Sequence, residues 1–148
     1  MSNLIYFSCG KNDDFAPAAG ESFFECRINS VKFKTENVGY SEEISPVTQQ
    51  SSYRMTANGL DSLGLPVYIS IVFDRVEKRE HPVFLYYLLH NTFSYGNPSL
   101  LIAGLPIFEI TEIRNKFISG KTNCQLHHNG GGQINITDGN FQYVHKNN

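Results

Sequence analysis

The stretch from residue 82 to residue 94 reads PVFLYYLLHNTFS and is dominated by apolar side chains. Proline is tolerated at the first position of a helix, because its missing N–H would have no intrahelical partner there. Gly96 and Pro98 follow the stretch, and glycine and proline often stand just beyond the last turn of a helix. We therefore expect a helix from Pro82 to about Ser94.

The expected helix would be apolar on nearly all sides. A helix packed on the surface of its own core carries an apolar stripe about 100° wide. Here the apolar positions are Val83, Phe84, Leu85, Tyr86, Tyr87, Leu88, Leu89 and Phe93. Either a neighbouring subunit covers the Tyr86 and Leu89 face, or strands and the loop 100–105 of the same chain wrap the helix. We favour the neighbouring subunit.

The rest of the chain predicts strands. The clearest is 67–76, where Val67, Ile69, Ile71 and Phe73 mark one face. Other segments are expected at 4–8, 24–33, 53–57, 107–113, 122–128, 133–137 and 141–145. The alternation of apolar and polar residues shifts at Asn29-Ser30, which indicates either a β-bulge or two successive strands. The predicted class is α+β, predominantly antiparallel β in a barrel or sandwich-like sheet, with one apolar helix near residues 82–94.

Dipeptides rich in asparagine, aspartate and glycine predict the turns. Asn58-Gly59 is expected to close the segment 53–57, and Asp138-Gly139 is expected to connect the last two segments. The polar stretch 35–52 is expected to be a loop.

Size and composition indicate one globular domain over residues 1–148, with 1–22 as an extended N-terminal segment. The chain has 148 residues, 41% of them hydrophobic and 18% charged, enough to bury roughly 70% of its unfolded surface. A net charge of −2, with scattered lysines and arginines, disfavours direct nucleic-acid binding. The first residues lack a basic region followed by an apolar core, so we expect a cytoplasmic protein without a membrane span.

Few residues are grouped in a pattern typical of a reactive thiol, a metal site or a phosphate-binding site. Cys9, Cys26 and Cys124 are odd in number and share no motif spacing, which predicts reduced, partly buried thiols. Cys124, His127 and His128 are metal-capable, but no second pair of ligands stands at a recognisable spacing, so we expect no metal site. The glycines 130–132 precede a strand pattern, which favours a hairpin turn over a phosphate-binding loop.

The sequence also shows no specific pattern of catalytic residues, and it indicates no cofactor. The carboxylates lie at strand-exterior or loop positions, no serine stands in a nucleophile-elbow pattern, and nothing places Cys9 beside His81. The mixed-sign run 74–80 is either a solvated linker or the charged rim of a subunit interface. We expect a protein that is not an enzyme.

The order of elements from Phe24 to Thr137 resembles the tail protein U family of contractile-tailed bacteriophages. The matching features are an opening strand at 28–33, a polar linker through Glu42-Glu43, the segment 53–60 before the strand 67–73, the helix at 82–93, the stretch 95–104 and the strand 108–113. The segment 1–22 and the residues after Asp138 depart from this pattern, and equally fit a relative in another contractile machine, such as a type VI secretion apparatus. The resemblance implies a small structural protein of a tail tube, terminator or baseplate that forms rings.

Two hypotheses of function follow. In the first, the chain is a homo-oligomeric ring subunit of a virion or related particle, and it docks on other tail or baseplate proteins. Its interface would contain Phe84, Leu85, Tyr86, Leu88 and Leu89, with rim contributions from Arg75, Lys78 and Arg79. In the second, it is a monomeric β-rich binding module, such as an immunity or carbohydrate-binding protein, with Tyr40, Tyr95 and Tyr143 as exposed recognition residues.

Overall fold

A computed structural model describes residues 21–81, 83–96, 107–115, 117–127 and 132–145. This part of the chain is all β and contains no helix, and therefore none long and apolar enough to cross a membrane. The strands are β1 (Phe23–Ile28), β2 (Val31–Thr35), β3 (Val38–Ile44), β4 (Ser51–Leu60), β5 (Pro66–Phe73), β6 (Val83–His90), β7 (Phe93–Gly96), β8 (Ile107–Arg114), β9 (Phe117–His127) and β10 (Gln133–Val144).

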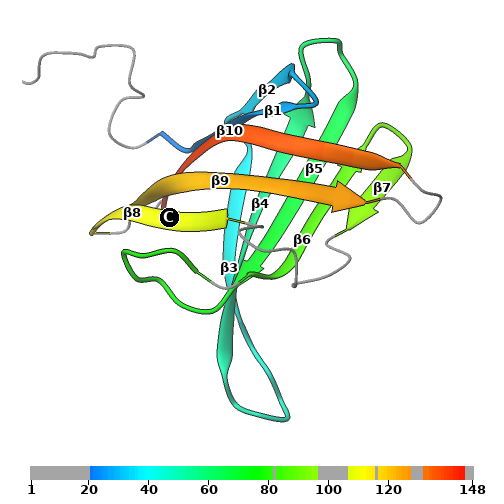
Figure 1. Cartoon of the computed structure of the whole chain (residues 1–148). Helices are drawn as coiled ribbons and strands as arrows, with labels where there is room; N and C mark the ends of the chain where they lie inside the picture. The colour runs from blue at the N-terminus through cyan, green and yellow to red at the C-terminus, as the bar shows by residue number, and fades with distance from the viewer. Residues whose placement is uncertain (1–20, 82, 97–106, 116, 128–131, 146–148) are drawn as a thin grey trace, which may run out of the picture.

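All ten strands belong to one antiparallel sheet that curls into a nearly closed barrel (Figure 1). The order is β2-β1-β10-β9-β7-β6-β5-β4-β3, and β8 also pairs with β9. β2 approaches the far end of β4 through a bridge between Phe33 and Asp61. β8 is held to the segment before β6, because the His81 N–H donates to the Phe108 carbonyl at 2.7 Å. The sheet therefore returns on itself and encloses one core.

The core consists of the inward side chains of nearly every strand. In β5, Val67, Ile69, Ile71 and Phe73 are all buried, as their alternation predicts for one face of a strand. Large aromatic rings from different strands meet inside: the ring centroids of Phe73 and Phe108 lie 4.5 Å apart, and those of Phe108 and Phe141 lie 4.8 Å apart. Aromatic packing across the barrel thus joins β5, β8 and β10.

The β3–β4 hairpin extends beyond the barrel (Figure 1). Its connection, residues 45–50, is closed by the Gln50 carbonyl accepting from the Ser45 N–H at 2.9 Å. Val47 near its tip is 87% exposed, and Ile44 is 60% exposed. The hairpin therefore carries two exposed aliphatic side chains, Ile44 and Val47, beyond the barrel.

The predicted helix at 82–94 is wrong, and with it the α+β class. Residues 83–90 form β6, and the turn at Asn91, where φ is 58°, leads directly into β7. A continuous apolar run of eight residues does not distinguish a strand from a helix, and its enrichment in aromatic residues favours the strand. β6 also shifts register opposite Val72 and Phe73, which leaves Phe84 without a partner in β5. This bulge breaks the simple alternation that would have marked a strand.

Several strand predictions are confirmed, with different ends. The segments 67–76 and 107–113 correspond to β5 and β8. The segment 24–33 is two strands joined at Asn29-Ser30, and both of these residues have positive φ.

The predicted turn at Asn58-Gly59 is wrong, because β4 continues to Leu60. Asp138-Gly139 is a bulge within β10 and not a turn. The stretch 35–52 contains β3, which we expected to be loop, and residues 4–8 lie outside the described part.

Gly120 in β9 marks the closest approach between two strands. A Cβ built at Gly120 would collide with the backbone carbonyl of Glu109 and with the ring of Phe141. Gly96, by contrast, has open space around the same position.

We predict that Gly120→Ala lowers the free energy of unfolding by about 1–3 kcal/mol, because the strands must move apart. Gly96→Ala is the matched control and should change it by less than about 0.5 kcal/mol. Urea denaturation followed by circular dichroism measures both. Equal stability of the two variants would contradict the packing of β8 on β9.

Candidate functional site

The predicted interface residues of β6 lie on two opposite faces. Tyr86 and Leu88 are fully buried in the core, and the Tyr86 hydroxyl lies 2.8 Å from Thr122 Oγ1. Leu85 and Leu89 face outward, and Leu85 is 37% exposed. The backbone of Phe84 belongs to β6, but its side chain lies outside the described part. Tyr86 and Leu88 are therefore unavailable to a partner.

The prediction of reduced, partly buried thiols is confirmed at the two described cysteines. Cys26 and Cys124 are free and buried. Burial, and then the nearby Glu25 carboxylate, raises the pKa of Cys26 to about 12, and burial raises the pKa of Cys124 further. Both thiols therefore stay protonated and unreactive near neutral pH. Cys9 lies outside the described residues.

Cys124 and His127 do not form a metal site. They stand three positions apart on β9, so their side chains point to opposite faces of the strand. Among the described residues there is no group of three His, Cys, Asp or Glu side chains that could hold a metal ion. His128 and the glycines 130 and 131 lie outside the described part, but the pairing of His127 with Gln133 makes β9 and β10 a hairpin, as predicted.

One apolar hollow, which we name the aromatic pocket, lies where the ends of several strands meet. It has a volume of about 260 Å³. β3, the loop after β5, the β8–β9 turn region and the end of β10 all contribute to its lining: Tyr40, Val76, Ile113, Arg114, Phe117, Ile118, Tyr143 and His145. The lining presents chiefly carbon to the pocket, so it is suited to an apolar group.

Two stacked tyrosines form the wall of the aromatic pocket. The rings of Tyr40 and Tyr143 have centroids 5.1 Å apart and planes 29° apart. Tyr40 also stacks on Tyr53 at 6.0 Å, and Tyr53 stacks on Phe73 at 5.8 Å. The wall therefore continues into the core, and we expect it to keep its shape without a ligand. Tyr95, the third predicted recognition residue, lies on β7, packs against the core and does not line this pocket.

Polar groups stand at the edge of the aromatic pocket. The Arg114 guanidinium carbon lies 4.3 Å from the centroid of the Phe117 ring, and its Nε lies 3.0 Å from Glu112 Oε2. His145 Nδ1 lies 3.4 Å from the Tyr143 hydroxyl. Arg114 can therefore donate further N–H groups toward a ligand while its charge is partly balanced by Glu112.

Tyr40 is a neutral phenol over the whole physiological pH range. Burial raises its pKa most, followed by the neighbouring Tyr53, Glu42 and Tyr143. An uncharged ring is the better stacking surface for another uncharged ring, because no phenolate repels the electron-rich face.

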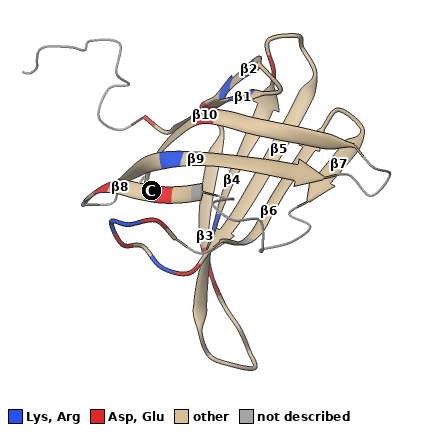
Figure 2. Ribbon diagram, in the orientation of Figure 1, with Lys and Arg blue, Asp and Glu red and all other residues tan. Residues whose placement is uncertain are grey.

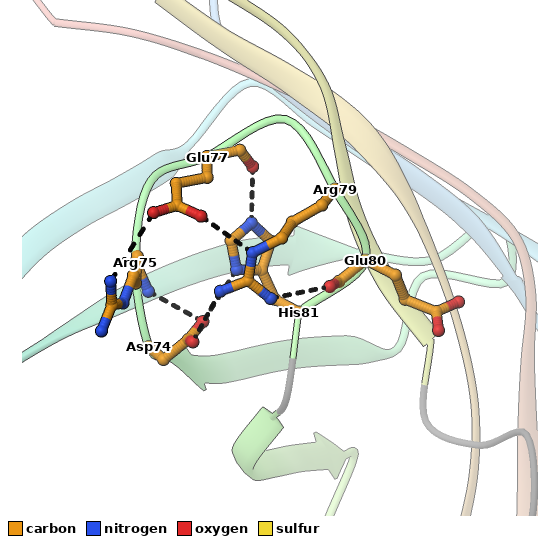
Figure 3. A network of polar contacts seen from close by, with 6 residues as sticks. All are labelled: Asp74, Arg75, Glu77, Arg79, Glu80 and His81. Atoms are coloured by element: carbon orange, nitrogen blue, oxygen red, sulfur yellow. Dashed lines mark hydrogen bonds and ion pairs between the residues drawn. The ribbon is translucent and has the colours of Figure 1, made fainter.

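A second polar cluster holds the loop between β5 and β6, and Figure 3 shows its side chains around His81. The Arg79 guanidinium donates to Asp74 Oδ2 and to Glu77 Oε2, both at 2.9 Å. Figure 2 shows that this loop carries residues of both charges. Of the predicted rim residues, Arg79 is engaged within the loop, while Arg75 and Lys78 are exposed.

His81 is buried between two hydrogen-bond acceptors. Its Nδ1 lies 2.7 Å from Asp74 Oδ1, and its Nε2 lies 2.6 Å from the Glu77 carbonyl oxygen. Both ring nitrogens are therefore engaged with oxygen atoms of the same loop, and neither is free to contact a ligand. The cluster fixes the loop that presents Val76 to the aromatic pocket.

Sequence reasoning named Tyr40 and Tyr143 but missed most of the pocket lining. Ile113, Arg114, Phe117 and Ile118 form the two strand ends beside the β8–β9 turn, and nothing in their local pattern marks a ligand site. The available signal was the density of aromatic residues in short strands that end near one another.

Comparison with protein-family models, with curated proteins and with solved structures finds no match to this chain. The resemblance to the tail protein U family therefore stays a prediction, and the helix on which it partly relied is not a helix.

The carboxylate of Asp74 should couple stability to pH. Burial alone would raise its pKa, but hydrogen bonds from His81 and Arg79 outweigh burial and lower it below the ordinary value. The stabilisation is therefore complete above the pKa of the unfolded chain, about 3.9, and is lost as the pH falls through the lower pKa of the folded protein.

We predict that Asp74→Asn lowers the free energy of unfolding at pH 7 by about 1–3 kcal/mol, because His81 and Arg79 lose their charged acceptor. The difference from wild type should shrink as the pH falls below about 3.9 and through the lower pKa of the folded protein, where the wild-type carboxylate also becomes protonated. Glu36→Gln, at an exposed carboxylate, is the control. Denaturant titrations between pH 7 and pH 2 measure this, and a pH-independent difference would contradict the assigned role.

Proposed function

We propose that this protein is a non-catalytic binding module that holds one ring of its ligand in the aromatic pocket. The observation that carries the proposal is the tyrosine-walled hollow at the end of a nearly closed barrel, formed by residues from distant parts of the chain. Its volume of about 260 Å³ lies below the range of roughly 300–1,000 Å³ typical of sites for drug-sized molecules. A single ring is therefore the best match.

An aromatic ring suits this lining better than a sugar ring. A sugar brings hydroxyl groups that need several hydrogen-bond partners once water is removed. The pocket offers mainly carbon surface from Ile113, Phe117 and Ile118, with polar atoms at its edge. An aromatic ring would be buried against Tyr40 and Tyr143 at no such cost, with roughly 0.5–1.5 kcal/mol from favourable ring contacts.

We predict that p-cresol, a single ring, binds the wild-type protein with a dissociation constant on the order of 1 mM. Binding should shift the NMR signals of the Tyr40 and Tyr143 rings. Ile113→Trp should fill the pocket and abolish these shifts without unfolding the protein, because Ile113 is 38% exposed. Val47→Trp, at the remote hairpin tip, is the control and should bind p-cresol as wild type does. Shifts that persist in Ile113→Trp would place the ring elsewhere and contradict the proposal.

A second candidate function is a structural subunit that assembles through the outer face of β5 and β6. Tyr68 pairs with Leu89, and Val72 pairs with Leu85, so these side chains share the outward face, on which Val72 is only 7% exposed. The rings of Tyr68 and Tyr87 also meet there, with centroids 6.5 Å apart. A strand that is apolar on both faces favours a partner on its outer side. This candidate retains the virion or cytoplasmic location expected from the sequence.

If the second candidate holds, size-exclusion chromatography with light scattering should give a multiple of 16.7 kDa at high concentration. Leu85→Glu should then return the protein to one copy, because it places a charge at the centre of the contact. Val47→Glu, at an equally apolar but remote position, should leave the assembly intact. A wild-type protein that stays at the mass of one chain would exclude self-assembly through this face.

A further inference from the structure

Beside the aromatic pocket lies a strand with an open backbone edge. Within the described part of the chain, β3 is the last strand of the sheet and pairs with β4 alone. The Val38 end of β3 is approached by Ser22 and Tyr143, which line one hollow together with Glu36. The half from Tyr40 to Ile44 leads away into the projecting hairpin (Figure 1). Every second residue of this half directs its N–H and C=O away from β4, as in any edge strand.

The side chains along this open half alternate between two faces. Tyr40 pairs with the buried Met55, and Glu42 pairs with Tyr53, so Tyr40 and Glu42 share the face that leads into the barrel. Ser41 and Glu43 share the outer face, where Glu43 is neutralised by Arg54 at 2.9 Å. Glu42 accepts a hydrogen bond from the Ser51 hydroxyl at 2.7 Å and, within the described part of the chain, pairs with no cation. An aromatic position and an acidic position thus stand two residues apart on one face.

We propose that the ligand is an extended peptide segment that adds to β3 as an antiparallel strand and carries the pattern basic-x-aromatic. In such a strand, the residue opposite Tyr40 and the residue opposite Glu42 are two positions apart and point to the same face. Directly opposite side chains lie about 4.5–5.5 Å apart at Cβ. The aromatic side chain would enter the aromatic pocket, and the basic side chain would pair with Glu42. This inference rests on the proposed function, because the pocket supplies the anchor.

Charge argues for a foreign basic segment over a second copy of this chain. Two β3 edges paired with each other would bring Glu42 and Glu43 of one copy against the same two residues of the other. Like charges across paired strands are destabilising. A basic side chain at the same position removes this repulsion and supplies a counter-charge for Glu42. The backbone pairing supplies affinity, and the pocket supplies the selection of an aromatic residue.

The probe is the peptide acetyl-Thr-Lys-Thr-Phe-Thr-amide, whose binding to the whole protein is followed by NMR and calorimetry. Two N-methylated isomers carry two methyl groups each, either on the backbone nitrogens of Lys and Phe or on those of the second and third Thr residues. In an added strand, the backbone N–H groups of one of these two sets of residues point toward β3, and those of the other set point toward solvent. One isomer should therefore bind roughly ten-fold more weakly than the unmodified peptide, while the other keeps its affinity.

A charge reversal tests the register. Glu42→Lys should weaken the lysine peptide roughly three- to ten-fold and should restore binding of the matching peptide with Glu in place of Lys. Glu36→Lys, which lies before β3, is the control and should change neither affinity. If the glutamate peptide fails to bind the Glu42→Lys variant, the proposed pairing of the peptide's Lys with Glu42 is overturned.

The outcomes separate the two proposals. If p-cresol binds in the aromatic pocket but both methylated isomers bind equally, or both fail equally, strand addition is overturned and the binding module stands. The same holds if the unmodified peptide does not bind while p-cresol does. If neither p-cresol nor the peptide binds, both proposals fail. Unequal binding of the two isomers, with competition between peptide and p-cresol, supports the inference.

Discussion

The stacking of Tyr40 on Tyr143 is the contact on which the rest of the structure depends. It joins β3, at one end of the sheet, to the end of β10, where no ladder of backbone hydrogen bonds connects the two strands in the described part of the chain. The same rings continue through Tyr53 and Phe73 into the core. The contact between β3 and β10, the core packing and the pocket wall are therefore linked by one set of aromatic contacts.

This arrangement explains why a ligand site lies at this end of the barrel. Side chains, and not a ladder of backbone hydrogen bonds, connect β3 to the end of β10 in the described part of the chain, and the described residues around the space between these strand ends are chiefly apolar. The loop that carries Val76 is fixed by the polar contacts of His81, Asp74 and Arg79. A pocket whose walls are held by both the core and a charged loop is preorganised, so little binding energy would be lost in ordering it.

The sequence predicted much of the sheet and little of the site. β5 and β8 were recognisable because apolar and polar residues alternate along them. β6 was taken for a helix, because its outward Leu85 and Leu89 are as apolar as its inward Tyr86 and Leu88. β3 was missed because most of its residues are exposed and polar. Tyr40 and Tyr143 were singled out, but their contact depends on barrel closure between distant parts of the chain, which no local pattern encodes.

A double-mutant cycle on Tyr40 and Tyr143 tests this account most directly. The free energies of unfolding of wild type, Tyr40→Leu, Tyr143→Leu and the double variant give the coupling between the two rings. We predict a favourable coupling of about 0.5–1.5 kcal/mol, as expected for stacked aromatic rings. Additive effects of the two substitutions, with no coupling beyond about 0.3 kcal/mol, would contradict the claim that this contact holds β3 against β10.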